Sequence, residues 1–308
     1  MSQTVFVTSA TGAQGLNVSR QLRAIGWEVH ATTRDLSSPA AQELKSLGVH
    51  LTQGDWDNEA ALKSALENCT ALFLCTILTF TDLSKELVQC KRILSLARAA
   101  GVKHVVYSSA CALAEVEKRI DLHTLGSPIM VASLQSKQDT EAVLREGGFE
   151  SWTILRGANF MENWLDPKVF MYPGLKETGV FRVAFIPGAK IPLVDTGDIA
   201  RFAVEAFKDP AKFHEKDINI VSDELSPEDI MAALAAVTNR SELRFEAVSD
   251  EQVHAEKDSN PFVTAGLAIR HMSSFMKNEE TDSWGIPTTT FKEFLKKNEE
   301  AVKKTYLS

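Results

Sequence analysis

Three small residues near the start of the chain, Ser9, Gly12 and Gly15, recur at a spacing of three. They fall between an apolar stretch typical of a buried strand and an amphipathic helix that begins at Gly12. A phosphate cradle needs such a turn, with backbone amides at a helix N-terminus and no side chain in the way. We therefore expect a dinucleotide site whose residues are Ser9, Thr11, Gly12, Ala13, Gln14 and Gly15.

Ser9 stands where the usual fingerprint has its first glycine. Serine is small and can donate its hydroxyl to a phosphate, but it resists the positive φ angle that glycine adopts freely. The alternative interpretation of the pattern is an ordinary strand, turn and helix with incidental glycines.

The charge that follows the second expected strand, residues 27–33, bears on the choice of dinucleotide. An acidic residue there binds the 2′-hydroxyl of NAD, whereas an arginine accommodates the 2′-phosphate of NADP. Arg34 occupies this place and Asp35 comes directly after it. The pattern favours NADP(H), and the alternative is a surface arginine without a ligand.

Asp55 and Trp56 follow the third expected strand, residues 49–55. The Asp55 carboxylate could accept a hydrogen bond from the adenine amino group, with Trp56 alongside. The alternative is a cap of the next helix, which Asp57 or Asn58 could also provide.

The elements that would position these residues alternate along the first half of the chain. Apolar strands are expected at 4–9, 27–33, 49–55, 71–76, 102–109 and 151–156, with helices between them at 12–25, 40–48, 58–68, 83–101 and 133–148. Nearly continuous apolar strands separated by helices indicate a parallel sheet covered on both faces. The fold class is therefore α/β, a doubly wound parallel Rossmann sheet.

The pattern changes after Arg156. We expect a Rossmann domain over 1–156 and a smaller C-terminal α/β lobe over 157–308, with roughly 190–222 returning to the sheet. The lobe would contain helices near 203–209, 227–238, 262–276 and 288–304, with strands at 217–221 and 243–248. An aromatic and methionine-rich stretch, residues 160–172, would form an apolar lid over a ligand or the core of this lobe.

Composition excludes several classes of function. The net charge of −8 and the pI of about 5.5 leave no basic excess to neutralise nucleic-acid phosphates. The four cysteines form no CxxC pair and no metal-ligand pattern, so no metal is expected. No apolar run reaches the roughly 18 residues that span a bilayer. These features, with the absence of a leader-like start, predict a cytoplasmic protein without a membrane partner.

An ordered set of segments resembles the NmrA-like family of atypical short-chain dehydrogenases/reductases. The segments are VFVTSATGAQG, TTRD, QGDWDN, VVYSSA, SKQDTEAVLREGG, TILRGANFMENW and IPLVDTGDIARFAVEAF. The resemblance covers nearly the whole chain and is weakest over 110–131 and 250–285. It implies either an NADP(H)-dependent reductase of quinones, dyes and other conjugated compounds, or an NADP-binding redox sensor without turnover.

Short-chain reductases use Tyr-x-x-x-Lys on one helix face, where the lysine lowers the tyrosine pKa and holds the nicotinamide ribose. On the matching helix Lys137 is present, but Ser133 replaces the tyrosine. The one literal match, Tyr172 to Lys176, has proline and glycine in its middle, which excludes the helical register. Lys137 is expected to hold the cofactor, the alternative being an exposed helix lysine.

The resemblance implies further site residues. Ser109, at the end of the fifth strand, matches a catalytic serine, although it could equally satisfy backbone amides. Three further contacts with the cofactor are expected: Thr76, which ends the fourth expected strand, and Asn159 and Phe160, which come shortly after the sixth. His123 is a conceivable proton donor, with a surface histidine as the favoured interpretation.

Asp195 and Asp198 belong to the family pattern, and Asp195 or Thr196 is expected to cap the following helix.

A missing phenol limits the chemistry rather than abolishing it. A quinone or an extended enone becomes a delocalised anion after hydride addition, and water or a ribose hydroxyl can protonate it. The sequence therefore predicts an NADPH-dependent oxidoreductase acting on a small, apolar, conjugated substrate. The alternatives are a non-catalytic NADP sensor acting through a protein partner and a redox-neutral isomerase on the same fold.

Overall fold

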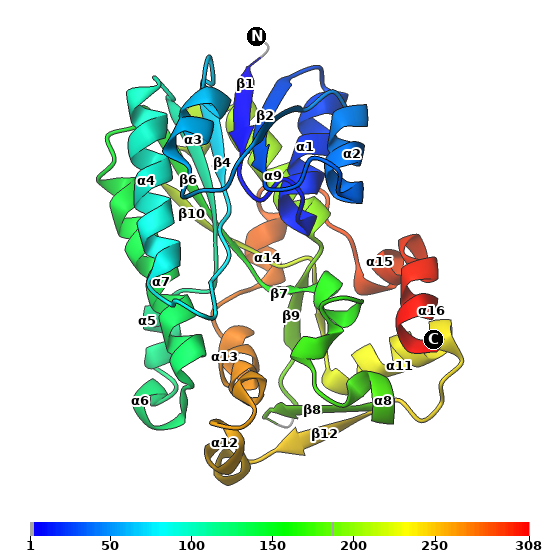
Figure 1. Ribbon diagram of the computed structural model, residues 1–308. Coiled ribbons are helices and arrows are strands. Elements are labelled where there is room, and N and C mark those ends of the chain that lie inside the picture. The colour runs from blue at the N-terminus through cyan, green and yellow to red at the C-terminus, as the bar shows by residue number, and fades with distance from the viewer. Residues whose placement is uncertain (1–2, 187, 308) are drawn as a thin grey trace. The chain divides into compact units, whose positions relative to one another are not determined.

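The computed structural model describes residues 3–186 and 188–307, and the chain divides into two compact units (Figure 1). The first unit comprises Met1–Ala110, Gln135–Arg156 and Ile199–Ile218, and the second comprises Cys111–Leu134, Gly157–Asp198 and Asn219–Ser308. The stretch 111–134 is thus grouped with the second unit, and 199–218 with the first. No helix in the described part of the chain is long and apolar enough to cross a bilayer.

Strands and helices alternate in the first unit. The strands are β1 (Thr4–Val7), β2 (Glu28–Thr33), β3 (His50–Gln53), β4 (Ala71–Leu74), β5 (His104–Ser109), β6 (Ser151–Gly157) and β10 (Lys216–Ile220). The helices are α1 (Ala13–Ala24), α2 (Pro39–Ser46), α3 (Glu59–Ala65), α4 (Lys85–Ala99), α7 (Pro128–Arg145), α9 (Thr196–Lys208) and α10 (Pro210–Phe213), of which α7 and α9 begin in the second unit.

The seven strands form one sheet in the order β10-β6-β5-β4-β1-β2-β3. β1 pairs in parallel with both β2 and β4, and the pairs β2–β3, β4–β5 and β5–β6 are parallel as well. The strand order reverses direction between β1 and β4, and a doubly wound sheet opens a crevice at the carboxyl ends of the strands on either side of such a point. The expected doubly wound Rossmann fold is confirmed.

The second unit is built from short elements. Its helices are α5 (Leu113–Glu117), α6 (Leu122–Leu125), α8 (Leu175–Thr178), α11 (Pro227–Thr238), α12 (Asp250–Glu256), α13 (Ala265–Met272), α14 (Asn278–Asp282), α15 (Phe291–Lys297) and α16 (Glu299–Leu307), with 3-10 turns at Met161–Trp164, Val169–Met171 and Pro261–Thr264. A sheet of three strands has the order β11-β9-β7, from Asp223–Leu225, Ile191–Val194 and Asn159–Phe160, and β8 (Val180–Ala184) pairs in parallel with β12 (Arg244–Val248).

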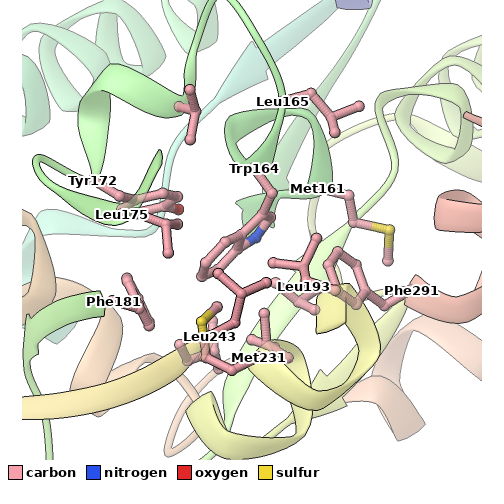
Figure 2. Close-up of a cluster of buried hydrophobic side chains, with 14 of the residues drawn as sticks. Met161, Trp164, Leu165, Tyr172, Leu175, Phe181, Leu193, Met231, Leu243 and Phe291 are labelled. Carbon is pink, nitrogen blue, oxygen red and sulfur yellow. The ribbon is translucent and has the colours of Figure 1, made fainter. Parts of the chain in front are cut away.

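Trp164 lies at the centre of the hydrophobic core of the second unit and is fully buried (Figure 2). Its ring packs 4.5 Å from that of Tyr172 and 4.8 Å from that of Phe181, between centroids. Met161 is also fully buried in this cluster, whereas Phe170 is 55% exposed. For Met161, Trp164 and Tyr172 the structure therefore favours core over lid, the second of the two interpretations above.

The expected single helix over 288–304 is two helices, α15 and α16, separated at Asn298. Thr290 begins α15 with a capping box, in which its hydroxyl accepts from the Glu293 amide while the Glu293 carboxylate accepts from the Thr290 amide. Asn298 leaves the helical backbone region with φ −109° and ψ 24°, which ends α15 there. The continuous apolar spacing concealed this break.

Candidate active site

The loop between β1 and α1 turns tightly at Ser9. The Gly12 amide donates to the Ser9 carbonyl oxygen at 2.8 Å, and Ser9 has a φ of +48°. Serine here adopts the left-handed conformation that a glycine would adopt freely, at a cost on the order of 1 kcal/mol. The loop therefore keeps the turn of the usual fingerprint without its first glycine.

The Ser9 side chain ties this loop to the neighbouring strand. Its hydroxyl donates to the Cys75 carbonyl oxygen at 2.9 Å, and the Thr8 hydroxyl donates to the same oxygen at 2.8 Å. Cys75 directly follows β4, so the bonds connect the two strand ends at the point where the sheet order reverses. The Ser9 hydroxyl thus braces the loop, and a contact between Ser9 and a phosphate stays a prediction.

Gly12 and Gly15 are required for different reasons. A Cβ on Gly15 would lie 2.4 Å from the Ser9 carbonyl oxygen, so only glycine lets α1 pack this closely on the loop. A Cβ on Gly12 would have that same oxygen as its nearest neighbour, at 3.3 Å, which is a tight but tolerable contact. Gly15 therefore serves the packing of this unit, and Gly12 leaves open space beside the helix start.

The N-terminus of α1 suits an anion. No side chain caps it at Gly12, and its first turn holds no acidic residue. The first amides of a helix have no partner within the helix and carry its positive dipole end. A pyrophosphate fits this combination of open amides, positive potential and space at Gly12.

Gln14, in the first turn of α1, contacts the end of β5. The Ser108 hydroxyl donates to the Gln14 side-chain oxygen at 2.5 Å. Ser108 thus lies on the same side of the sheet as the glycine loop. Sequence reasoning selected its neighbour Ser109 instead, because strand spacing alone does not show which of two adjacent serines faces this loop.

Arg34 and Asp35, directly after β2, have different surroundings. Arg34 is exposed, and its guanidinium has no hydrogen-bond or ion-pair partner among the residues that the structure describes. The Asp35 carboxylate accepts from the Ser37 amide at 2.7 Å and from the Ser37 hydroxyl at 2.5 Å. These bonds lower the pKa of Asp35. Asp35 is therefore committed to a local turn, while Arg34 is available to a ligand.

Asp55 also belongs to a local turn. Its carboxylate accepts from the Asp57 and Asn58 amides, both at 3.0 Å. Asn58 is the residue that caps α3, through a bond from the Ala61 amide at 3.0 Å. Asp55 is exposed, and Trp56 is half-buried against the hydrophobic cluster that includes Leu72 and Leu74 of β4. Contacts of Asp55 and Trp56 with an adenine remain predictions.

Lys137 is neither exposed nor isolated. Its ammonium donates to the Thr76 carbonyl oxygen at 3.0 Å and to the Glu86 carboxylate at 2.5 Å. The lysine side chain is 14% exposed and that of Glu86 is fully buried. Burial alone would lower the pKa of Lys137, but its electrostatic interactions with Tyr107 and Glu86 outweigh the effect of burial and raise that pKa. The alternative of an exposed helix lysine is wrong.

Ser109 faces a different network. Its hydroxyl donates to the Glu141 carboxylate at 2.7 Å, and Arg156 binds both oxygens of that carboxylate. Arg156 and Arg145 also share Asp217, at 2.8 and 2.5 Å. Ser109 therefore helps to satisfy a buried ion pair that joins β5, α7, β6 and β10. A catalytic role for Ser109 remains untested.

Three expected site residues belong to the second unit: Ser133, Asn159 and Phe160. Ser133 is half-buried and lies one turn before Lys137 on α7. The Asn159 amide donates to the Tyr172 hydroxyl at 3.0 Å, and burial raises the pKa of Tyr172 to about 12. This phenol remains protonated at neutral pH and is buried in the core.

His123 is exposed on α6, in keeping with the favoured interpretation of a surface histidine. Asp195 accepts from the Gly197 amide at 2.7 Å, which agrees with the expected cap at the start of α9. Asp198 accepts from the Ser222 hydroxyl at 2.6 Å and from the Thr289 amide at 2.7 Å. Asp198 therefore ties together separate segments of the second unit.

Glu86 escaped sequence reasoning, although a signal was present. Its position in the first turn of α4 is where an acidic residue commonly stabilises the helix dipole. However, Glu86 shares the inward face of that helix with Cys90, Ile93 and Ala97, at spacings of four, seven and eleven. A carboxylate on an apolar face requires a buried partner, which is Lys137.

In the described part of the chain, no group of three His, Cys, Asp or Glu side chains could hold a metal ion.

Three comparisons place the chain among known proteins. The model of the NmrA-like family matches residues 1–299. A reductase of (4-alkanoyl-5-oxo-2,5-dihydrofuran-3-yl)methyl phosphate from Streptomyces griseus is 31% identical over 244 residues, covering 79% of this chain and 76% of the relative.

Two solved structures share the fold. The NADPH-dependent quinone oxidoreductase QOR2 of Escherichia coli, complexed with NADPH, has a TM-score of 0.70 at 24% identity and covers 95% of this chain and 99% of its own. The negative transcriptional regulator NmrA, in complex with NADP, has a TM-score of 0.68 at 22% identity and covers 99% of this chain and 96% of its own. One of these proteins is an enzyme and the other a regulator.

Proposed function

The chain belongs to the NmrA-like family, and on that premise we propose that it is an NADPH-dependent reductase of small, apolar, conjugated acceptors. The observation that carries this proposal is the first unit itself, where an uncapped helix start at Gly12 and an unpartnered Arg34 follow adjacent strands of the sheet. The second unit would supply the substrate-binding surface.

Different residues of the first unit would bind different parts of the cofactor. The open amides of Ala13 and Gln14 would hold the pyrophosphate, and the Arg34 guanidinium would hold the 2′-phosphate. Lys137 would hold the nicotinamide ribose, since an ammonium has three donors and only two of them are engaged, by Thr76 and Glu86. The bound nucleotide supplies the hydride.

The absence of a phenol at position 133 sets the substrate class. Serine is a much weaker acid than tyrosine, so Ser133 is a poor proton donor to an alkoxide. Acceptors that delocalise the charge left by hydride addition need no such donor. The S. griseus relative is named as a reductase of a conjugated furanone and QOR2 as a quinone oxidoreductase, which supports the same class here.

The test follows NADPH absorbance with quinones, enones, triarylmethane dyes and plain ketones. We expect oxidation with the conjugated acceptors and little or none with ketones. Ser133→Ala should change turnover only slightly, because that hydroxyl is not the acid. A large loss of turnover in Ser133→Ala would show that the serine had replaced the tyrosine, and the proposed chemistry would be wrong.

A regulatory function is the second candidate, favoured by the likeness to a transcriptional regulator that binds NADP and by the missing phenol. The same experiment separates the two functions. Tight NADPH binding without turnover of any acceptor would support the sensor, whose partner would be a protein because the net charge of −8 disfavours nucleic acid. Interconversion of an added substrate without change in NADPH would indicate a redox-neutral isomerase.

A further inference from the structure

The Lys137 ammonium is fixed by acceptors on two different elements. Thr76, whose carbonyl oxygen accepts one of the bonds, is the second residue after β4, and Glu86 lies in the first turn of α4. The Thr76 hydroxyl also donates, at 2.9 Å, to the Glu86 oxygen that accepts from Lys137. Thr76 therefore contacts both members of the ion pair. The Lys137 head group is therefore held at the carboxyl end of β4, beside the point where the sheet order reverses.

Stability alone does not account for this ion pair. Removing both charges from water carries a large desolvation cost, and apolar side chains of similar volume often fill such a space equally well. The pair is also incompletely satisfied, because the second Glu86 oxygen has no hydrogen-bond partner among the described residues. A buried and partly unsatisfied pair is better explained by a ligand that the Lys137 side chain, which is 14% exposed, can bind.

We propose that Glu86 is the positioning residue of Lys137, holding its ammonium where the third donor can reach the ribose of the dinucleotide. The inference rests on the proposed function and deepens it. Glu86 does not touch the cofactor. It acts by holding the lysine ammonium beside the Thr76 carbonyl oxygen and by supplying the negative charge that the burial of the lysine requires.

The charges around Lys137 make this role measurable. The groups that face its ammonium are Glu86 on α4, Tyr107 on β5 and Cys75 after β4. Burial raises the pKa values of Tyr107 and of Cys90, beside Glu86, so both groups are neutral at physiological pH. Without the carboxylate, desolvation would dominate and lower the pKa of Lys137. The lysine would then lose its proton within an accessible pH range.

The experiment compares NADPH dissociation constants between pH 7 and pH 10 for the wild-type protein and three variants. The wild-type affinity should stay constant, because Lys137 remains charged throughout. Glu86→Gln should bind NADPH about tenfold more weakly at pH 7, the equivalent of one pKa unit of lost interaction, and progressively more weakly as pH rises. Thermal unfolding of each unliganded variant reports separately on folding.

A second substitution tests the mechanism by rescue. In Glu86→Gln combined with Lys137→Arg, the guanidinium cannot deprotonate, so the pH dependence should disappear even if the affinity stays reduced. Asp57→Asn is the matched control, since Asp57 also binds residues of α4, Lys85 at 2.7 Å and Arg92 at 2.9 Å, without contacting Lys137. It should retain the wild-type affinity and the flat profile.

The outcomes are separable. A wild-type protein that binds no NADPH would refute the proposed function. Wild-type binding with an unchanged affinity and a flat profile in Glu86→Gln would overturn the role of Glu86 alone. If Glu86→Gln does not fold, Glu86→Asp is the substitute, because it keeps the charge but moves the carboxylate away from Lys137 by the length of one methylene. An NADPH affinity of Glu86→Asp equal to that of the wild type would also overturn the inference.

Discussion

At the scale of single residues, the cofactor choice depends on two neighbours with opposite charges. Asp35 would favour NAD if its carboxylate were free, but two bonds from Ser37 hold it in a local turn. Arg34 has no such commitment within the described chain. For predicting which dinucleotide binds, the position of a residue after the strand is therefore less informative than the hydrogen bonds that its side chain already makes.

We expect Arg34→Ala to remove a preference for NADPH over NADH. A charge-assisted hydrogen bond contributes about 1.5–3 kcal/mol, so the NADPH affinity should fall roughly ten- to a hundredfold while that for NADH stays unchanged. Calorimetric titration with both nucleotides measures the two constants. Arg20→Ala is the control, because Arg20 is also exposed but pairs with Glu43. Equal affinities of the wild-type protein for NADPH and NADH would contradict this prediction.

At the scale of elements, the strand, loop and helix of the fingerprint could be predicted from sequence. The different roles of its two glycines, Gly12 and Gly15, could not. The spacing of Ser9, Gly12 and Gly15 indicates a phosphate loop, but spacing does not distinguish a glycine that admits a ligand from one that admits a backbone. That difference depends on where a Cβ would lie, which only coordinates give.

Substitution at the two glycines should separate binding from folding. Gly12→Val should abolish NADPH binding with little loss of stability, because its Cβ meets only one carbonyl oxygen at 3.3 Å but its branches would occupy the space of the pyrophosphate. Gly15→Ala should lower the melting temperature, since its Cβ would be 2.4 Å from that oxygen. Ser9→Gly should leave the NADPH affinity unchanged or improved, because glycine adopts the positive φ without strain and this offsets the lost hydroxyl bond to Cys75. Normal binding in a folded Gly12→Val would show that the loop is not a phosphate cradle.

The same limit explains the residues that were missed. Lys137 was identified through resemblance, but its partner Glu86 lies 51 positions earlier and only the packing of α4 and α7 brings them together. Similarly, alternation places Ser108 and Ser109 on opposite sides of β5 without saying which side holds the glycine loop. Pairing between distant elements is a tertiary property that local patterns do not encode.

At the scale of the whole molecule, the doubly wound parallel sheet could be predicted from sequence, whereas the arrangement of the second unit could not. Apolar strands alternating with helices admit few arrangements, and right-handed crossovers select among them. The second unit has short elements such as β7 and α8, and its aromatic residues follow no period because they pack around Trp164 rather than along one face. The sequence predicts which apolar residues are available for the core of this unit, but not how they pack against one another.

The stability of the second unit should depend on pH through Glu162. Its carboxylate accepts from the amide of Thr196, at 3.1 Å, and from the hydroxyl of that residue, while its other oxygen is buried without a partner among the described residues. Burial, together with the charge of Asp195, raises the pKa of Glu162 from 4.5 to about 7. The folded protein thus retains a proton that the unfolded chain releases.

The sign of the effect follows from that difference. Between about pH 4.5 and pH 7 the native state binds more protons than the unfolded state, so stability is greatest below this range and decreases as pH rises through it. Glu162→Gln removes the titration and should flatten the profile, which makes the variant more stable than wild type at pH 8 by up to about 3 kcal/mol. Glu177→Gln, an exposed substitution in the same unit, should leave the slope unchanged. Thermal unfolding from pH 4.5 to pH 8 measures all three proteins, and a slope that survives in Glu162→Gln would assign the dependence to another group.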